Sequence, residues 1–126
     1  MRFLNNLYTI NRKNVDAQNH QYEIKLDPNH MIFQAHFPNE PITPGVCIIQ
    51  IAKELLEEIV QVPLMIHGVK NVKFLNVISP LTTPIVIYEF EKIVGNDEEN
   101  EYRAQVLVMS TDVSLAKLSF ICKKLC

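Results

Sequence analysis

Residues 43–63, TPGVCIIQIAKELLEEIVQVP, are the stretch of sequence that decides the fold. Thr43 is predicted to be the N-cap of a helix, because a threonine hydroxyl accepts a hydrogen bond from a first-turn N–H group, and Pro44 suits the first helical position. The helical pattern runs to about Gln61. Its first turns are apolar on nearly every side, whereas KELLEEI (53–59) is amphipathic. We therefore expect a helix whose first turns are buried on all sides and whose last turns reach the surface.

Strand-like segments precede and follow this helix. Residues 20–26 alternate in polarity, with Tyr22, Ile24 and Leu26 on one face, which is typical of a half-buried strand. Further extended segments are predicted at about 7–14, 31–35, 67–78, 85–94, 102–108 and 116–122. Successive strands joined by short turns favour antiparallel pairing. The sequence therefore predicts an α+β fold, in which a curved antiparallel sheet of about five to six strands wraps one long buried helix.

Length and composition fit a single domain, which we expect to span residues 1–126. The chain has 126 residues, of which 48% are hydrophobic, and its net charge is −2. The sequence shows no basic stripe of the kind that binds nucleic acid, so we expect no nucleic-acid partner. The acidic residues concentrate at one place, which we interpret as a solvated hairpin tip: Asp97, Glu98, Glu99 and Glu101.

The sequence also bears on the compartment. No stretch approaches the ~20 apolar residues that cross a bilayer, so no membrane insertion is expected. The N-terminal residues turn polar at Asn5 and lack the apolar segment of a signal peptide. The three cysteines, Cys47, Cys122 and Cys126, suit a reducing compartment, which predicts a cytoplasmic protein. Cys47 lies near a helix start, where a thiolate is favoured, but we interpret it as a small buried hydrophobe.

Metal and cofactor chemistry has no support in the sequence. The spacings among His20, His30 and His36 do not match a zinc site, and no cysteine stands at ligand spacing. We interpret His20, His30 and His67 as hydrogen-bonded structural residues. No metal or other cofactor is therefore expected.

The loop before the helix is conformationally restrained. Pro38, Pro41 and Pro44 fall within seven residues, and each fixes its own φ. The first N–H groups of a helix have no intrahelical partners, so a stiff loop that leads into a buried helix is typical of an anion or oxyanion site. His36 lies at the start of this loop. We therefore expect the chemistry of the protein to lie at the helix N-terminus.

Residues 36–52, HFPNEPITPGVCIIQIA, carry a family resemblance. They are similar to the signature of the 3-hydroxyacyl-acyl-carrier-protein dehydratases of the hotdog fold (FabA/FabZ type), which reads approximately HFPG-x-P-x-x-PGV-L-I-x-E-A. Eight positions match in identity and spacing without a gap: His36, Phe37, Pro38, Pro41, Pro44, Gly45, Val46 and Ile48. Outside this segment only the pattern of elements agrees.

The resemblance implies a role for each matching residue. His36 would be the general base and acid that removes the α-proton of the acyl thioester. The backbone N–H of Gly45 or Val46 would hold the thioester carbonyl, on which negative charge develops. Phe37 and Pro38 would help to bind the substrate. Family sites form across a homodimer, so we expect a homodimer or a higher even oligomer.

The second catalytic position of the family, an acid that protonates the leaving hydroxyl, falls on Gln50. A glutamine keeps the shape of glutamate but cannot deliver a proton, so a weak or silent dehydratase is expected. Other departures are Asn39, where the family has glycine, and residues 79–84, SPLTTP, where it has a Pro-Gly-Asp turn. Three carboxylates are candidates for a substitute acid, and we interpret them as surface charges: Glu40, Glu54 and Glu57.

Three functions remain open from the sequence. The first is dehydration of a 3-hydroxyacyl thioester to the 2-enoyl thioester, in fatty-acid or related polyene or polyketide biosynthesis. The second is a non-catalytic hotdog subunit that binds acyl thioesters, and the third is a thioesterase of the same fold. The partner would be an acyl carrier protein or an acyl-CoA. Basic side chains could dock an acidic carrier protein, and the candidates are Lys70, Lys73, Lys123 and Lys124.

Overall fold

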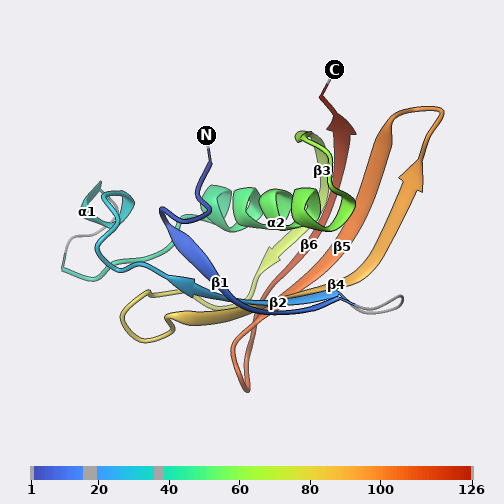
Figure 1. Cartoon of the computed structure of the whole chain (residues 1–126). Coiled ribbons are helices and arrows are strands. Elements are labelled where there is room, and N and C mark those ends of the chain that lie inside the picture. Colours follow the sequence, from blue (N-terminus) through green and yellow to red (C-terminus); the bar gives the residue numbers. More distant parts are fainter. Residues whose placement is uncertain (1, 16–19, 36–38, 126) are drawn as a thin grey trace.

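Six strands form one antiparallel sheet around a long helix in the computed structural model of the chain (Figure 1). The structure describes residues 2–15, 20–35 and 39–125. The strands are β1 (Tyr8–Val15), β2 (His20–Leu26), β3 (Leu64–Phe74), β4 (Ile85–Asn96), β5 (Glu101–Met109) and β6 (Ser114–Lys124). The helices are α1 (Ile32–Ala35) and α2 (Gly45–Val60). The order across the sheet is β1-β2-β4-β5-β6-β3, which puts β1 and β3 at its two edges.

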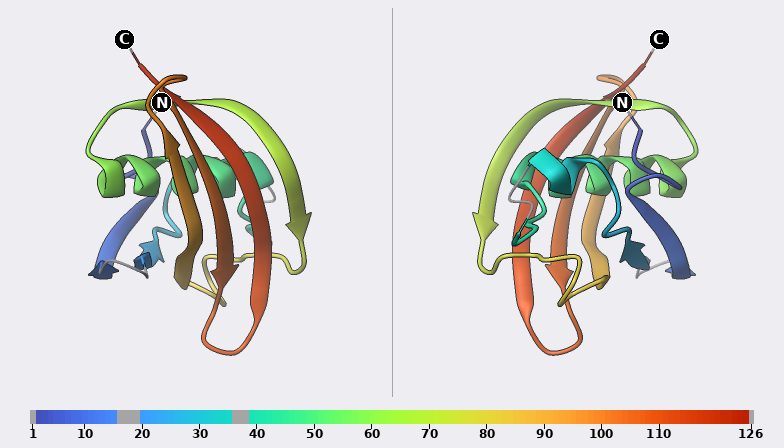
Figure 2. Two further views of the ribbon diagram at one scale, coloured as in Figure 1. Left: turned by 90° about the vertical axis from the view of Figure 1, so that its right-hand side faces the viewer. Right: turned by 90° about the vertical axis from the view of Figure 1, so that its left-hand side faces the viewer.

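The sheet curves around α2, and the helix lies along the concave face between the two edge strands (Figures 1 and 2). The core forms where the apolar stripe of α2 meets the inward-facing residues of the strands. Ile51 and Leu55 of the helix are buried, as are Ile24 and Val86 of the sheet. Tyr88 on β4 donates its hydroxyl to the carbonyl oxygen of Ile48 at 3.0 Å, which attaches the helix to the middle of the sheet.

Several predicted elements are confirmed. The strand at 20–26 has the bounds that its alternation indicated, and its Tyr22, Ile24 and Leu26 are buried together. The alternating residues of β5 and β6 point inward as expected, and the sheet has six antiparallel strands. The long helix is also present, although it begins at Gly45. The expected α+β architecture is therefore correct.

A strand was predicted at 31–35, but this segment contains the short helix α1. His30 causes the difference, because its Nδ1 accepts the backbone N–H of Ile32 at 3.0 Å. The carbonyl of His30 also accepts the N–H of Phe33 at 3.1 Å. A side chain that accepts a first-turn N–H favours a helical turn over an extended chain.

Thr43 is not the N-cap of α2. Pro44 occupies that position, with no side-chain hydrogen bond, and the Thr43 hydroxyl caps nothing. The first turn is also not buried on all sides, because Val46 is 73% exposed. Val46 is exposed because the sheet covers the side of α2 that carries Cys47 and Ile48. Those two residues are buried, whereas Val46 lies outside the covered side.

Two expectations about the β4–β5 hairpin are wrong. A register shift between Phe90 and Lys92 adds one residue to β4, which moves Val94 from the inner to the outer face, where it is exposed. Glu101 does not belong to the solvated tip, because it is buried at the start of β5, where its carboxylate accepts the Arg103 Nε–H at 3.1 Å. The remaining acidic residues of the hairpin tip, at 97–99, are exposed.

Within the described residues, no helix is long and apolar enough to cross a membrane.

Leu55 provides a test of the buried helix, because it is 0% exposed and lies in the middle of α2. We expect Leu55→Ala to lower the free energy of unfolding by about 2–5 kcal/mol, since it leaves a cavity between helix and sheet. Urea denaturation followed by circular dichroism measures the change. Leu81→Ala, at a loop leucine that is 64% exposed, is the control and should change it by less than about 1 kcal/mol. Equal losses in the two variants would contradict the core assignment.

Candidate active site

The N-terminus of α2 presents backbone donors. The carbonyl of Pro44 accepts the N–H groups of Cys47 and Ile48, at 3.0 and 3.2 Å, and these are the first hydrogen bonds of the helix. The N–H groups of Gly45 and Val46 precede them and are directed out of the helix end. The helix macrodipole adds a partial positive charge at the same place. This end of α2 therefore suits an oxygen atom that gains negative charge.

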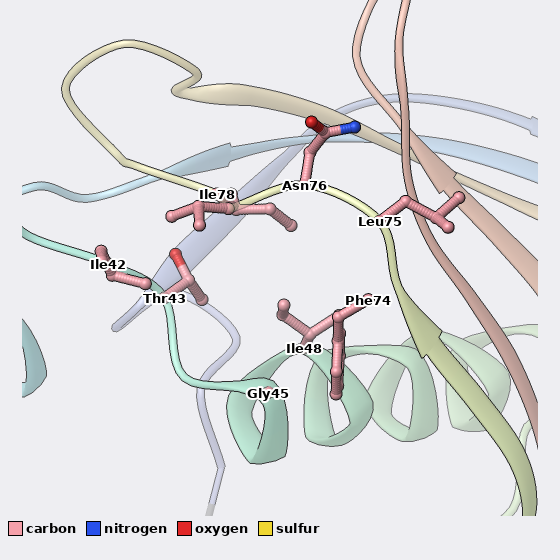
Figure 3. A pocket seen from close by; sticks show the side chains of 9 residues that line it. Ile42, Thr43, Gly45, Ile48, Phe74, Leu75, Asn76 and Ile78 are labelled. Carbon is pink, nitrogen blue, oxygen red and sulfur yellow. The ribbon is translucent and has the colours of Figure 1, made fainter.

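A cavity of about 290 Å³ lies beside this helix end (Figure 3). It is formed by the segment that enters α2, the first turns of the helix and the chain that follows β3. The lining is mostly apolar and consists of Ile42, Thr43, Gly45, Ile48, Phe74, Leu75, Asn76, Val77 and Ile78. An apolar cavity that meets a few polar groups is the usual form of a small-molecule site.

The absence of a side chain on Gly45 allows the close approach of Phe74 at this helix end. A Cβ atom on Gly45 would lie 2.6 Å from Cζ of the Phe74 ring, closer than real side chains come. The ring from the end of β3 therefore lies directly on the first helical residue (Figure 3). Phe74 itself is half exposed. It forms the wall of the cavity on the side of the edge strand.

Gln50 lies one turn further along α2 and contacts a buried carboxylate. Its Nε2–H donates to Oε2 of Glu54 at 2.9 Å. Glu54 is only 2% exposed and accepts three more hydrogen bonds, from the N–H groups of Phe3 and Leu4, each at 2.8 Å, and from the Tyr8 hydroxyl at 3.0 Å. A carboxylate can only accept hydrogen bonds. The NH₂ group of the Gln50 amide, rather than its oxygen, therefore faces Glu54.

Glu54 and Glu57 are therefore not the surface charges that the sequence suggested. Glu54 joins the N-terminal segment and β1 to the helix. Glu57 accepts the backbone N–H of Leu64 at 2.7 Å and pairs with Arg2 and Lys53 at 3.3 and 3.4 Å, so it holds the start of β3. The i,i+4 spacing of Gln50 and Glu54 was visible in the sequence, but the donors from residues 3–8 were not. Glu40 is exposed, as expected.

Among the residues of the region that the structure describes, the other titratable side chains form no second reactive centre. His36, Phe37 and Pro38 lie outside the described residues. Cys47 is buried, and this burial raises the pKa of its thiol, which agrees with its interpretation as a small hydrophobe rather than a nucleophile. Burial and then the nearby Glu54 raise the pKa of Tyr8, so its hydroxyl remains a donor to that carboxylate. Among the described residues, no three His, Cys, Asp or Glu side chains are grouped to hold a metal ion.

Gln50 and the cavity are on different flanks of α2. The contacts of Gln50 lead through Glu54 to Tyr8 on β1, whereas the cavity opens against Phe74 on β3. These strands are the two opposite edges of the sheet (Figure 2). The two candidate regions of one chain are thus separated by the body of the helix.

The curved six-stranded antiparallel sheet that encloses one long helix defines a hotdog-fold protein. The chain belongs to the ApeI-like family of dehydratases, whose family model matches residues 12–111. This match confirms the resemblance to hotdog dehydratases that residues 36–52 indicated.

Individual relatives agree with this assignment. The 3-hydroxyacyl-[acyl-carrier-protein] dehydratase FabZ of Latilactobacillus sakei subsp. sakei (strain 23K) is 29% identical over 121 residues, which cover 90% of this chain and 77% of that protein. Among solved structures, the dehydratase heterocomplex ApeI:P from Xenorhabdus doucetiae gives a TM-score of 0.68 at 17% identity, with 91% and 96% of the two chains covered. A protein of Lactococcus lactis described as a candidate thioesterase gives a TM-score of 0.67 at 10% identity, with 99% and 98% covered, and shares the fold.

Glu54→Gln tests the buried carboxylate. The substitution keeps the shape but replaces one acceptor oxygen by a donor, which leaves a buried donor of the N-terminal segment without an acceptor. We expect the free energy of unfolding to fall by about 1–3 kcal/mol. Glu58→Gln is the matched control, because Glu58 makes only a 3.4 Å pair with exposed Lys13, and it should cost less than about 1 kcal/mol. Urea titration of both variants measures the change in the free energy of unfolding. Similar losses of stability in the two variants would contradict the role of Glu54.

Proposed function

We propose that this protein removes water from a 3-hydroxyacyl thioester to give the 2-enoyl thioester, with the acyl chain carried on an acyl carrier protein throughout. The observation that supports this function best is the apolar cavity at the N-terminus of α2, beside the N–H groups of Gly45 and Val46. A thioester carbonyl placed there would be held by these donors while its acyl chain enters the cavity. Dehydration is the reaction that membership in a family of dehydratases supports.

The reaction can be written with the residues of this chain. His36 takes a proton from C2 of the substrate, and negative charge develops on the thioester oxygen, which the Gly45 and Val46 N–H groups stabilise. The electron pair forms the C2=C3 double bond and the C3–O bond breaks. Because Gln50 has no proton to give, the proton on the His36 imidazole returns to the leaving oxygen, and water departs. One histidine thus serves as base and then as acid.

We propose that the site is assembled from two copies of the chain, in a homodimer or a higher even oligomer. Gln50 and the cavity lie on opposite flanks of α2, so a second copy is the means by which both would reach one substrate. The edge strand β3 and the residues after it carry exposed apolar side chains, which favours association there. They are Met65, Val69, Phe74, Leu75 and Val77. The whole chain, residues 1–126, would act as one domain in the cytoplasm.

A carrier protein is acidic as a class, so basic side chains near the cavity favour its docking. Lys70 and Lys73 are exposed on β3, the strand that ends at Phe74. Lys123 and Lys124 lie at the end of β6 and are partly buried, with Lys124 placed 5.7 Å from the centre of the Tyr102 ring. Both pairs remain candidates, because the first pair lies on the strand along which a second copy is proposed to associate.

A non-catalytic role is the second candidate, and the Gln50–Glu54 contact favours it. The amide of Gln50 is held by an acceptor that already has three other donors, so this position is built around a neutral side chain. Such a protein would bind acyl thioesters without converting them. Thermal-shift titration with 3-hydroxyacyl thioesters, beside the activity assay, separates the two candidates. Release of free thiol from an acyl-CoA without dehydration would instead indicate a thioesterase.

His36→Ala tests the proposed base. We expect the rate of 2-enoyl thioester formation to fall by about 10²–10⁴-fold, the usual contribution of a general acid or base. The absorbance of the conjugated product measures this rate with 3-hydroxyhexanoyl-pantetheine. Lys25→Ala, at an exposed position of β2, is the control and should keep the wild-type rate. A wild-type rate equal to that of His36→Ala would refute the dehydratase.

Gln50→Glu tests the missing acid. The introduced carboxyl would stand at hydrogen-bond distance from Glu54, and two carboxylates so close cannot both be ionised, so its pKa is expected to rise. It would then carry a proton near neutral pH, and the dehydration rate should increase by at least about tenfold. Because the acid acts when protonated, this gain should disappear as the pH rises through the elevated pKa. A rate that stays at the wild-type level from pH 5 to 9 would show that another group supplies the proton.

A further inference from the structure

A second hollow lies on the outer face of the sheet, away from α2 and its cavity. Its volume is about 240 Å³, and its lining residues come from the neighbouring strands β4, β5, β6 and β3. Figure 2 shows these strands side by side, with the helix behind them in the left view. The lining includes Lys70, Lys92, Val94, Arg103, Ser119 and Ile121. The hollow shares no residue with the cavity beside Gly45, so it is a separate candidate site.

Two β-bulges bring lysine side chains to this hollow. In β4 the register shift between Phe90 and Lys92 adds one residue, so Lys92 faces outward although Phe90, two residues earlier, is buried in the core. In β3 the shift between Val69 and Asn71 leaves Lys70 as the extra residue. β-bulges re-aim side chains and are frequent beside functional sites. Two different strands therefore contribute a lysine to the same place, each through an irregularity of its ladder.

The charges of the hollow are not balanced within the chain. Arg103 is the third cation, and its Nε–H donates to the Glu101 carboxylate at 3.1 Å. Within the described residues, Lys70 and Lys92 take part in no ion pair, and no carboxylate lines the hollow. Three positive charges less the one paired carboxylate leave two, and like charges gathered around one small space repel each other. The arrangement therefore favours a ligand with two negative charges.

We propose that this hollow binds the phosphate group of a small phosphate monoester. Such a group carries close to two negative charges at neutral pH, and its three terminal oxygens accept hydrogen bonds from lysine and arginine. Lys70, Lys92 and Arg103 would bind these oxygens, while the Ser119 hydroxyl adds a neutral donor. The charge of the ligand then equals the charge that the chain leaves unpaired.

The organic part of the ester would lie against the apolar lining. Ile121 on β6 is only 6% exposed although it faces outward, and Val94 on β4 is 45% exposed. A volume of 240 Å³ corresponds to about eight water molecules at roughly 30 Å³ each, which accommodates a phosphate group and about three carbon atoms. A three-carbon phosphate ester therefore fits the hollow. This inference does not depend on the proposed dehydration, because the two sites are separate.

Calorimetric titration of the wild-type protein with sn-glycerol 3-phosphate tests the proposal. We expect a Kd of about 1 mM or lower. Dimethyl phosphate, which has a single negative charge, should bind at least about tenfold more weakly, and glycerol should not bind. The titrations are done at constant ionic strength, because salt screens exposed charges. Equal affinity for the two phosphates, or no binding of sn-glycerol 3-phosphate up to about 10 mM, would overturn the site.

Substitutions assign the binding to the hollow. Lys92 lies on β4 in the middle of the sheet, away from the β3 edge where we propose association of two copies. Lys92→Gln should raise the Kd at least about tenfold, and Lys70→Gln should act similarly, because each removes a charged hydrogen-bond donor. Lys25→Gln, at an exposed lysine of β2 that does not line the hollow, is the matched control and should leave the Kd unchanged.

Urea denaturation should give the three variants the midpoint of the wild type, since all three lysines are exposed. A loss of phosphate binding in Lys92→Gln is then not a loss of folding. An equal increase of the Kd in Lys25→Gln and Lys92→Gln would overturn the proposal, because it would show a general attraction of anions to the protein surface.

The same phosphate monoester occurs in the headgroup of phosphatidic acid, so vesicles separate a lipid from a free ester. We expect no co-sedimentation with phosphatidylcholine vesicles that contain phosphatidic acid. The reason is that the hollow would enclose the three-carbon part, on which a lipid carries its two acyl chains. Sedimentation that Lys92→Gln abolishes would overturn the assignment to a free ester in favour of a lipid headgroup. None of these results bears on dehydration, which the His36→Ala assay tests independently.

Discussion

The burial of α2 in the concave face of the sheet is the constraint on which the other features depend. The helix must be held from both edges of the sheet, and it is held differently at each. On the β1 side the attachment is polar, through the Glu54 carboxylate and the backbone N–H groups of Phe3 and Leu4. On the β3 side it is the contact of the Phe74 ring with Gly45. The apolar edge leaves a cavity beside the helix N-terminus.

Local patterns predicted those elements whose residues alternate without interruption. The strand at 20–26 and the inward faces of β5 and β6 follow directly from such alternation. Prediction failed where one side chain or one extra residue changed the local geometry. The His30 imidazole turned a strand-like segment into α1, and the added residue in β4 reversed the face of Val94. Effects of this kind arise from single contacts, and the periodicity of apolar residues in a sequence does not predict such contacts.

The candidate site was predictable as far as it depends on adjacent residues. The proline-rich loop predicted unpartnered N–H groups at the start of a helix, and the family resemblance assigned them to Gly45 and Val46, residues that the structure places at the N-terminus of α2 beside a cavity. Glu54 was interpreted as a surface charge because its partners are about fifty residues away in the sequence. Thr43 was expected to cap the helix, but Pro44 occupies the cap position. In both cases the chain topology, rather than the residue type, decided the environment.

The departure from the dehydratase pattern at position 50 acquires a physical meaning in this fold. At position 50 an amide replaces an acid, next to a carboxylate that four donors hold in place. Glutamine preserves the side-chain volume of glutamate while it changes the hydrogen-bonding character of the position, so the fold tolerates it. The consequence of this departure is therefore to be sought in proton transfer rather than in the packing of the helix against the sheet, which a side chain of the same shape leaves unchanged.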